Sequence, residues 1–203
     1  MQEYNFNYID NPFTEEKIDG KVYLMARPND KHLLIQDNLL TIFNNYFTGK
    51  KKKCRAISEQ QIYVNENNYV QPDLLIYCKN NNEKKNKTVP LIVIEVLSDS
   101  TWKKDMTAKM RKYAELGIEE YWTIDPRSQR ISIYKLEKGR YRPEPVEVYN
   151  YPLNLADDEF SIVPEIREKE QQEVVKEFAP SFFPDLTIAL EDIFDFEALD
   201  FVR

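Results

Sequence analysis

Glycine, cysteine, histidine and long apolar runs are all scarce in this sequence. Only 4 Gly and 2 Cys occur among 203 residues, which excludes collagen-like repeats and disulfide-rich scaffolds. A single His leaves a catalytic triad at most one candidate base. No apolar run is long enough to cross a membrane as a helix, and the N-terminus has no apolar segment typical of a signal peptide. These absences predict a soluble, cytoplasmic protein.

The two cysteines, Cys54 and Cys78, stand 24 residues apart without further Cys or clustered His around them. Two cysteines cannot form a disulfide framework, and they lack the partners of a zinc site. We therefore expect both to be reduced thiols, as is usual in cytoplasmic proteins.

Charge is unevenly distributed along the chain. The formal net charge is −7, which taken alone disfavours binding to nucleic acid. Residues 157–203, however, hold 14 acidic and only four basic side chains, so that residues 1–156 carry +3. Basic clusters occur at residues 50–53, 84–87 and 103–112. Each cluster alone is typical of a solvated surface, but together they permit a phosphate-facing surface on the first three-quarters of the chain.

The pattern of apolar residues predicts one α/β domain over residues 1–203, with the acidic segment 157–203 packed on it. A mixed central sheet is flanked by helices, and Asp19-Gly20 predicts an N-terminal hairpin. The expected helices are 30–47, capped by Asp30, 101–116, ended by Gly117, 164–178 and 190–194. The expected strands are 21–26, 55–57, 61–64, 74–77, 91–97, 120–124, 130–135 and 141–149.

Two carboxylates stand inside or beside apolar strands. Glu95 interrupts the run LIVIEVL, and Asp73 precedes the run LLIY. A buried carboxylate is costly unless it is paired or bound to a metal. If the two strands are neighbours, these oxygens suit Mg²⁺ or Mn²⁺. The alternative, which these residues alone leave equally open, is that Asp73 caps a turn and Glu95 pairs with a basic side chain.

The helix that follows Glu95 places a lysine on its apolar face. At 100° per residue, Lys109 lies in the stripe of Trp102, Met106 and Tyr113, whereas Lys104 falls on the opposite face. A lysine in such a stripe either extends its ammonium to solvent or directs it at buried carboxylates. Asp105, four residues earlier, is spaced to pair with it.

Other chemistries have weaker support. The sequence contains no G-x-G-x-x-G, P-loop or G-x-S-x-G motif. His32, on the first predicted helix, is by itself more typical of a structural residue than of a catalytic base. Asp73 and Glu95 could also form a metal-free acid/base pair, as in glycosidases, but no sugar-binding surface is evident.

In this order, the motifs resemble the Uma-two family of restriction-endonuclease-like proteins, within the PD-(D/E)XK nuclease superfamily. The matching segments are Glu16–Gly20, His32, Gln71–Leu75, Ile94–Thr101, Asp105, Lys109, Tyr113, Gly117–Trp122, Ile124–Pro126, Phe183–Leu186 and Leu190–Phe194. They extend over nearly the whole chain, and they imply a restriction-endonuclease-like core.

The resemblance also implies roles for individual residues. Asp73 and Glu95 would bind the catalytic Mg²⁺ or Mn²⁺, with the carbonyl of Val96 as a further ligand. Leu97 stands where the usual E-x-K lysine would be, and Lys109 would replace that lysine. Glu16 would lie near the metal. Asp105 would support Lys109, and Tyr113 and His32 match further family positions.

The leading hypothesis is a metal-dependent endonuclease that hydrolyses phosphodiester bonds in nucleic acid, with DNA favoured as substrate and a homodimer as its assembly. The rival hypothesis is a non-catalytic nucleic-acid-binding or interaction module that keeps the nuclease fold.

Overall fold

A seven-stranded mixed sheet forms the centre of the computed structural model, which describes residues 15–25, 27–79, 89–151 and 174–197. Only β7 and β8 are parallel; the other neighbours are antiparallel. In pairing order the strands are β10 (Arg140–Tyr141), β9 (Arg130–Glu137), β8 (Glu120–Asp125), β7 (Ile92–Val96), β6 (Leu74–Cys78) and β3 (Cys54–Ser58), with β11 (Glu147–Asn150) also paired to β9. As expected for strands covered on both faces, β7 and β8 are buried throughout.

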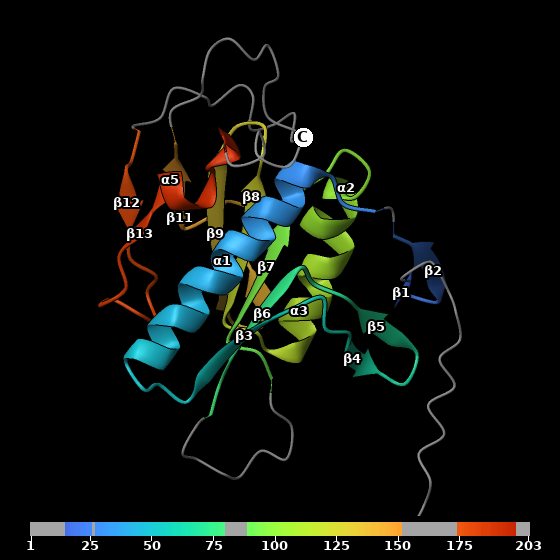
Figure 1. The fold of residues 1–203 in the computed structure, drawn as a ribbon. Helices are drawn as coiled ribbons and strands as arrows, with labels where there is room; N and C mark the ends of the chain where they lie inside the picture. The colour runs from blue at the N-terminus through green and yellow to red at the C-terminus, as the bar shows by residue number, and fades with distance from the viewer. Residues whose placement is uncertain (1–14, 26, 80–88, 152–173, 198–203) are drawn as a thin grey trace, which may run out of the picture.

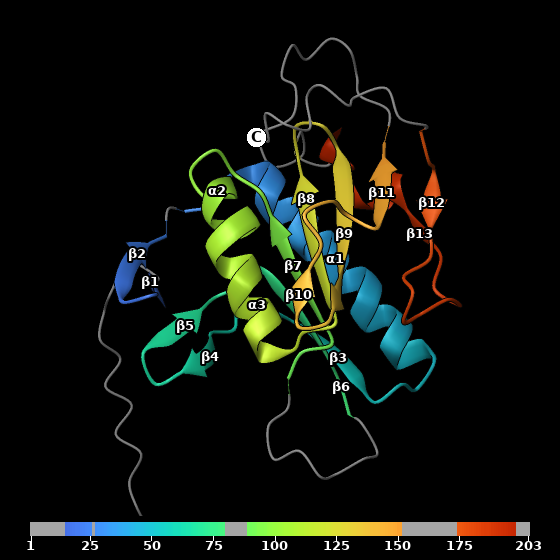
Figure 2. The same ribbon diagram turned by 180° about the vertical axis from the view of Figure 1, so that it is seen from behind.

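Helices cover both faces of this sheet (Figures 1 and 2). Helix α1 (Asp30–Gly49) packs on one face, where Phe43 lies 6.0 Å from the Trp122 ring. The predicted cap is wrong, because the side chain of Asn29 and not that of Asp30 accepts the capping hydrogen bond from the His32 N–H. None of the helices in the described ranges is long and apolar enough to span a membrane.

The opposite face carries three consecutive helical segments, α2 (Trp102–Lys104), the π-helical turn η1 (Asp105–Lys109) and α3 (Met110–Leu116). They occupy the range predicted as one helix, and Gly117 ends it at φ 75°, a left-handed conformation that glycine adopts without steric cost. The π-helical turn was not predicted. Such turns are rare and occur frequently at functional sites.

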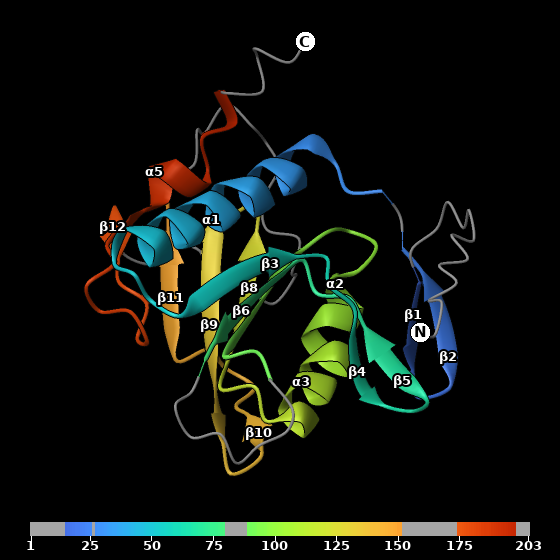
Figure 3. The same ribbon diagram turned by 60° about the horizontal axis from the view of Figure 1, so that its bottom comes forward.

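A second, four-stranded antiparallel sheet lies beside α3 (Figure 3). In pairing order its strands are β2 (Lys21–Leu24), β1 (Glu15–Ile18), β5 (Asn68–Val70) and β4 (Ile62–Asn65). The predicted hairpin is present, with positive φ at Asp19 and Gly20. Ile18 and Val70 are buried in the same apolar cluster as Tyr113, so this sheet closes over the helix that carries Lys109.

The described part of the C-terminal segment packs against the face that carries α1. It contains β12 (Glu177–Phe178), β13 (Ile188–Ala189) and α5 (Leu190–Ile193), the last close to the predicted helix. The predicted helix 164–178 is wrong at 174–178, where Val174 forms a bridge with Asn150 and residues 177–178 form a strand; residues 164–173 lie outside the described ranges. The single strand expected over 141–149 is instead split between β10 and β11.

The prediction of reduced cysteines is wrong, because Cys54 and Cys78 form a disulfide. Cys54 begins β3 and Cys78 ends β6, and these two positions are direct partners in the antiparallel ladder. That register arises from tertiary pairing between distant segments, which sequence spacing does not reveal. The bridge fixes the end of β6 that is remote from Asp73.

Glu120 provides a pH-dependent anchor for the C-terminal segment. Its carboxylate accepts hydrogen bonds from Trp122 Nε1 at 3.0 Å and from the Ser181 hydroxyl. Burial raises the pKa of Glu120 above its usual value, more than these two donors lower it.

Since the unfolded chain ionises Glu120 more readily, wild-type stability should decline as pH rises from about 4 through the folded-state pKa. Urea unfolding of Glu120→Gln, which does not titrate, should therefore show a stability gain relative to wild type on going from pH 4 to pH 7. A difference independent of pH would contradict this.

Candidate active site

Asp73 and Glu95, the two carboxylates singled out in the sequence, lie opposite each other on neighbouring strands of the central sheet. Leu74 pairs with Ile94 in the antiparallel ladder of β6 and β7, so Asp73, directly before β6, lies opposite Glu95. Strands β7 and β8 run parallel, and their carboxyl ends share this edge of the sheet. Helix α1 approaches from one face and the α2–η1–α3 segment from the other (Figure 3).

Asp73 is held by helix α1 and strand β7. One oxygen, Oδ1, lies 3.1 Å from His32 Nε2 on α1, and Oδ2 accepts the Val96 N–H at 2.7 Å. Gln36 Nε2 donates to the main-chain carbonyl of Asp73 at 2.8 Å. Burial acts to raise the pKa of the Asp73 carboxyl, but His32, Lys109 and the Val96 amide together lower it. Asp73 is thus fixed as a carboxylate.

Lys109 is buried, with 2 % of its side chain exposed, so of the two alternatives its ammonium is directed at buried carboxylates and does not extend to solvent. Its ammonium lies 2.5 Å from Glu95 Oε1, 3.0 Å from Glu16 Oε1 and 3.5 Å from Asp105 Oδ1. Burial lowers the pKa of this lysine, yet the surrounding carboxylates outweigh that effect and raise the pKa well above its usual value. Lys109 therefore keeps its charge at all pH values relevant to nucleic-acid chemistry.

Glu16 belongs to the four-stranded sheet, here called the outer sheet. It joins Asp73, Glu95, Asp105, Lys104 and Lys109 in one carboxylate–lysine cluster. It is fully buried on β1, where Oε1 accepts the Gln71 N–H at 2.9 Å and contacts Lys109. The other oxygen, Oε2, lies 2.5 Å from Lys104 Nζ. Burial raises the pKa of Glu16, but the two lysines outweigh it and lower the pKa. In this arrangement Glu16 bridges the two lysines.

The predicted position of Lys104, on the helix face opposite Lys109, is wrong. In the structure Lys104 points into the cluster and contacts Glu16. The reason is η1, which begins directly after Lys104. A π-helical turn contains one extra residue, so the residues before it are rotated by roughly 100° relative to an uninterrupted α-helix. A wheel aligned on Lys109 therefore misplaces Lys104.

Two tyrosines complete the buried side of the cluster. The Tyr113 hydroxyl donates to Glu95 Oε1, and the Tyr121 hydroxyl donates to the main-chain carbonyl of Asp105 at 3.1 Å. Burial raises the pKa of both Glu95 and Asp105, and the neighbouring carboxylates add to this, while Lys109 opposes it. The cluster thus carries more carboxylate than its lysines neutralise.

This excess of carboxylate is what a divalent cation would relieve. The described residues contain no group of three or more His, Cys, Asp or Glu side chains already arranged around a metal position. The donor chemistry nevertheless fits Mg²⁺ or Mn²⁺, since Asp73 and Glu95 offer oxygen ligands on facing strands. Asp105 Oδ1 is in addition buried without a hydrogen-bond partner.

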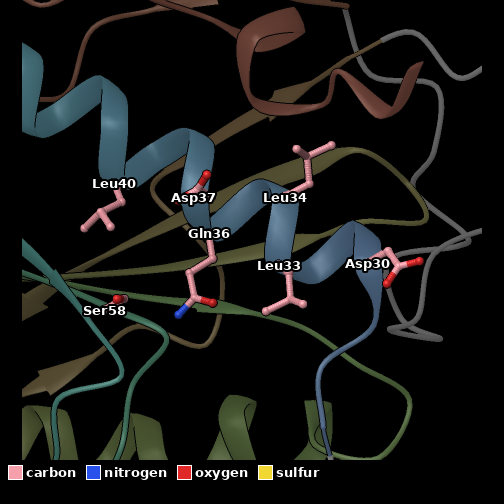
Figure 4. A pocket seen from close by; sticks show the side chains of 7 residues that line it. All are labelled: Asp30, Leu33, Leu34, Gln36, Asp37, Leu40 and Ser58. Atoms are coloured by element: carbon pink, nitrogen blue, oxygen red, sulfur yellow. The ribbon is translucent and has the colours of Figure 1, made fainter. Parts of the chain in front are cut away.

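A pocket of about 400 Å³ lies along α1 (Figure 4). Its lining combines three leucines with two carboxylates, an amide and a hydroxyl: Asp30, Leu33, Leu34, Gln36, Asp37, Leu40 and Ser58. Gln36 and Leu33 point toward the strand that carries Ser58 (Figure 4), and Gln36 links the pocket to Asp73. With acidic and no basic residues in its lining, this pocket is not a phosphate site.

The two predicted basic clusters that the structure describes, 50–53 and 103–112, do not form one surface around the site. Residues 50–53 precede Cys54, at the end of β3 opposite the one beside Asp73, and Lys50 and Lys52 pair there with Asp185. Residues 84–87 lie outside the described ranges. Of the two described clusters, the one at 103–112 reaches the carboxylates, through Lys104 and Lys109.

Comparisons with known proteins agree with this geometry. Residues 2–167 match the model of the Uma2 family, described as "Putative restriction endonuclease". The uncharacterized protein slr1290 of Synechocystis sp. is 31% identical over 122 residues, which span 59% of this chain and 64%, less than two thirds, of that protein. The crystal structure of a nuclease described as putative, of the DUF820 group from Anabaena variabilis, matches with a TM-score of 0.62 at 22% identity over 90% of both chains.

The structural match establishes the fold, a mixed α/β architecture shared with that Anabaena protein. The family model covers well over half of the sequence and includes every residue of the carboxylate–lysine cluster. The chain therefore belongs to the Uma2 family of restriction-endonuclease-like proteins.

Proposed function

We propose that this protein is a metal-dependent endonuclease that hydrolyses phosphodiester bonds in nucleic acid, with DNA as the substrate to test first. The observation that carries the proposal is the buried ion pair of Lys109 and Glu95, whose atoms lie 2.5 Å apart, directly across the ladder from Asp73. Membership of a family described as restriction endonucleases supports the same reaction class.

Asp73 and Glu95 would hold Mg²⁺ or Mn²⁺, with the Val96 carbonyl as a further ligand. When bound, such an ion polarises a phosphodiester and lowers the pKa of a coordinated water. The chain's own residues prepare the site. His32 and the Val96 amide orient the Asp73 carboxylate, and Lys109 and Tyr113 orient that of Glu95.

Lys109 contributes a permanent positive charge behind the carboxylates. Such a fixed charge stabilises the negative charge that develops on a phosphoryl group during hydrolysis. Asp105 lies 3.5 Å from the ammonium and helps to keep it charged and directed at Glu95. Glu16 holds the same ammonium from the side of the outer sheet.

The test is cleavage of supercoiled plasmid and of labelled oligonucleotide duplexes by purified protein with Mg²⁺, Mn²⁺ or EDTA. Wild type should cleave with either metal and not with EDTA. Asp73→Asn removes one anionic ligand and should reduce the rate by at least about 100-fold. Asp185→Asn, which alters a carboxylate that pairs with Tyr46 and Lys52 away from the site, should cleave as wild type.

Two outcomes would contradict the proposal. Cleavage that persists in EDTA would point to the metal-free acid/base pair. Binding of nucleic acid without cleavage or metal binding would favour a non-catalytic module. One observation supports this second function: both oxygens of Asp73 already have partners within the chain.

A homodimer would allow both strands of a duplex to be cut, and sedimentation of the DNA complex tests it.

A further inference from the structure

Three polar side chains form the part of the site that solvent can reach. Asp73, His32 and Lys104 have side-chain exposures of 11 %, 12 % and 13 %, whereas those of Glu16 and Lys109 are 0 % and 2 %. A phosphate that approaches the carboxylates from solvent therefore meets Lys104 before it meets Lys109.

Of these three groups, Lys104 is the one that carries an ammonium, with three N–H donors. We propose that Lys104 is a second functional lysine, which contacts a phosphate of the bound nucleic acid at the mouth of the site. This inference rests on the proposed function and extends it. The two lysines then have different roles: Lys104 binds substrate, and Lys109 orients Glu95.

The geometry holds Lys104 ready for such a contact. Glu16 Oε2, at 2.5 Å, takes one of the three N–H donors of the ammonium. The same ammonium lies 5.5 Å from the centre of the Tyr23 ring on β2, within range of a cation–π contact. These two contacts hold the Lys104 side chain against β1 and β2, and the remaining N–H donors of its ammonium are available to a phosphate oxygen.

The electrostatics of the cluster favour a cation beside Asp73. Glu16, Asp73, Glu95 and Asp105 surround the site, and Lys109 is already enclosed by three of them. An approaching phosphodiester would be repelled by Asp73 at the mouth unless a positive charge stood beside it. The π-helical turn provides that charge, because it rotates Lys104 toward the carboxylates and away from bulk solvent.

The chain offers a matched control in Lys103, the preceding residue on the same short helix. Lys103 is exposed and lies 5.4 Å from the centre of the Trp102 ring, away from the contacts of the cluster. Lys103→Met and Lys104→Met remove the same charge from adjacent positions. Any difference between the two variants therefore results from the position of the lost lysine and not from the change in net charge.

The experiment measures binding and cleavage separately for wild type, Lys103→Met, Lys104→Met and Lys104→Arg. Binding is followed by fluorescence anisotropy of a labelled duplex in EDTA over a series of KCl concentrations. Cleavage is followed with Mg²⁺ to obtain kcat and KM. Urea unfolding of each variant identifies any loss of stability.

We expect Lys104→Met to lower the slope of log Kd against log[KCl] by about one, the value for one lost phosphate contact. Its kcat/KM should fall about 10- to 100-fold, the size of one charge-assisted hydrogen bond. Lys103→Met should match wild type in both respects, and Lys104→Arg should retain the wild-type slope.

The proposal is overturned if Lys104→Met and Lys103→Met share the wild-type slope and kcat/KM. It is also overturned if Lys104→Met loses stability alone, since a merely structural partner of Glu16 would behave in that way. Either result leaves the proposed nuclease function intact, because wild type still cleaves. If wild type neither binds nor cleaves nucleic acid, both proposals fail together.

Discussion

Lys109→Met should greatly slow nucleic-acid cleavage and also destabilise the protein. The substitution keeps an apolar stem of similar length but removes the charge that three carboxylates share. Breaking a buried ion pair by removal of one partner costs about 3–5 kcal/mol, because the remaining charge stays buried without compensation. Loss of a fixed positive charge at the reacting phosphate should reduce cleavage by at least about 100-fold.

The measurement pairs urea unfolding with single-turnover cleavage at a temperature where the variant is folded. Lys112→Met is a suitable control, since that buried lysine pairs with Asp19 and Glu115 outside the carboxylate cluster. It should lose some stability and keep its cleavage rate. A Lys109→Met protein that is as stable and as active as wild type would show that the cluster has neither role.

Reduction of the Cys54–Cys78 disulfide should be the second large effect, on stability alone. The bridge closes a loop that spans 24 residues of sequence separation. The loop-entropy model gives a stabilisation of about 3 kcal/mol for a loop of this length. Because the bridge joins the ends of β3 and β6 remote from Asp73, cleavage by the reduced, folded protein should match that of the oxidised protein.

The measurement compares urea unfolding of wild type with and without a reductant, with Cys54→Ser/Cys78→Ser as the matched variant. The variant should unfold at the same urea concentration whether or not reductant is present. A wild-type midpoint that reductant does not change, or titration of two free thiols in the untreated folded protein, would contradict the bridge.

The buried carboxylates and Lys109 were predictable because they break local patterns. Glu95 stands in an otherwise apolar strand, and Lys109 stands in an apolar helical stripe; both are buried in the structure. A charged residue is costly to bury without a partner of opposite charge, and in the structure Glu95 and Lys109 are partners. That the strands of Asp73 and Glu95 are neighbours was only a condition of the prediction from the sequence, and the structure meets it.

What could not be predicted depends on contacts between distant segments or on an irregular backbone. The register of β3 against β6, which joins the cysteines, has no local signal in the sequence. The π-helical turn reverses the face assigned to Lys104, because a regular helical wheel assumes a constant rotation per residue. The bridging of two lysines by Glu16 requires the outer sheet to close over the helix, which only the fold reveals.

Anomalous diffraction from crystals soaked in Mn²⁺ tests the central claim most directly, because manganese both suits oxygen ligands and identifies itself by its scattering. The account predicts a manganese peak at the carboxylates of Asp73 and Glu95 in wild type and its loss in Asp73→Asn. A fully soaked wild-type crystal with no peak at these two residues, or with manganese bound only elsewhere, would contradict the assignment of this cluster as the metal-dependent nuclease site.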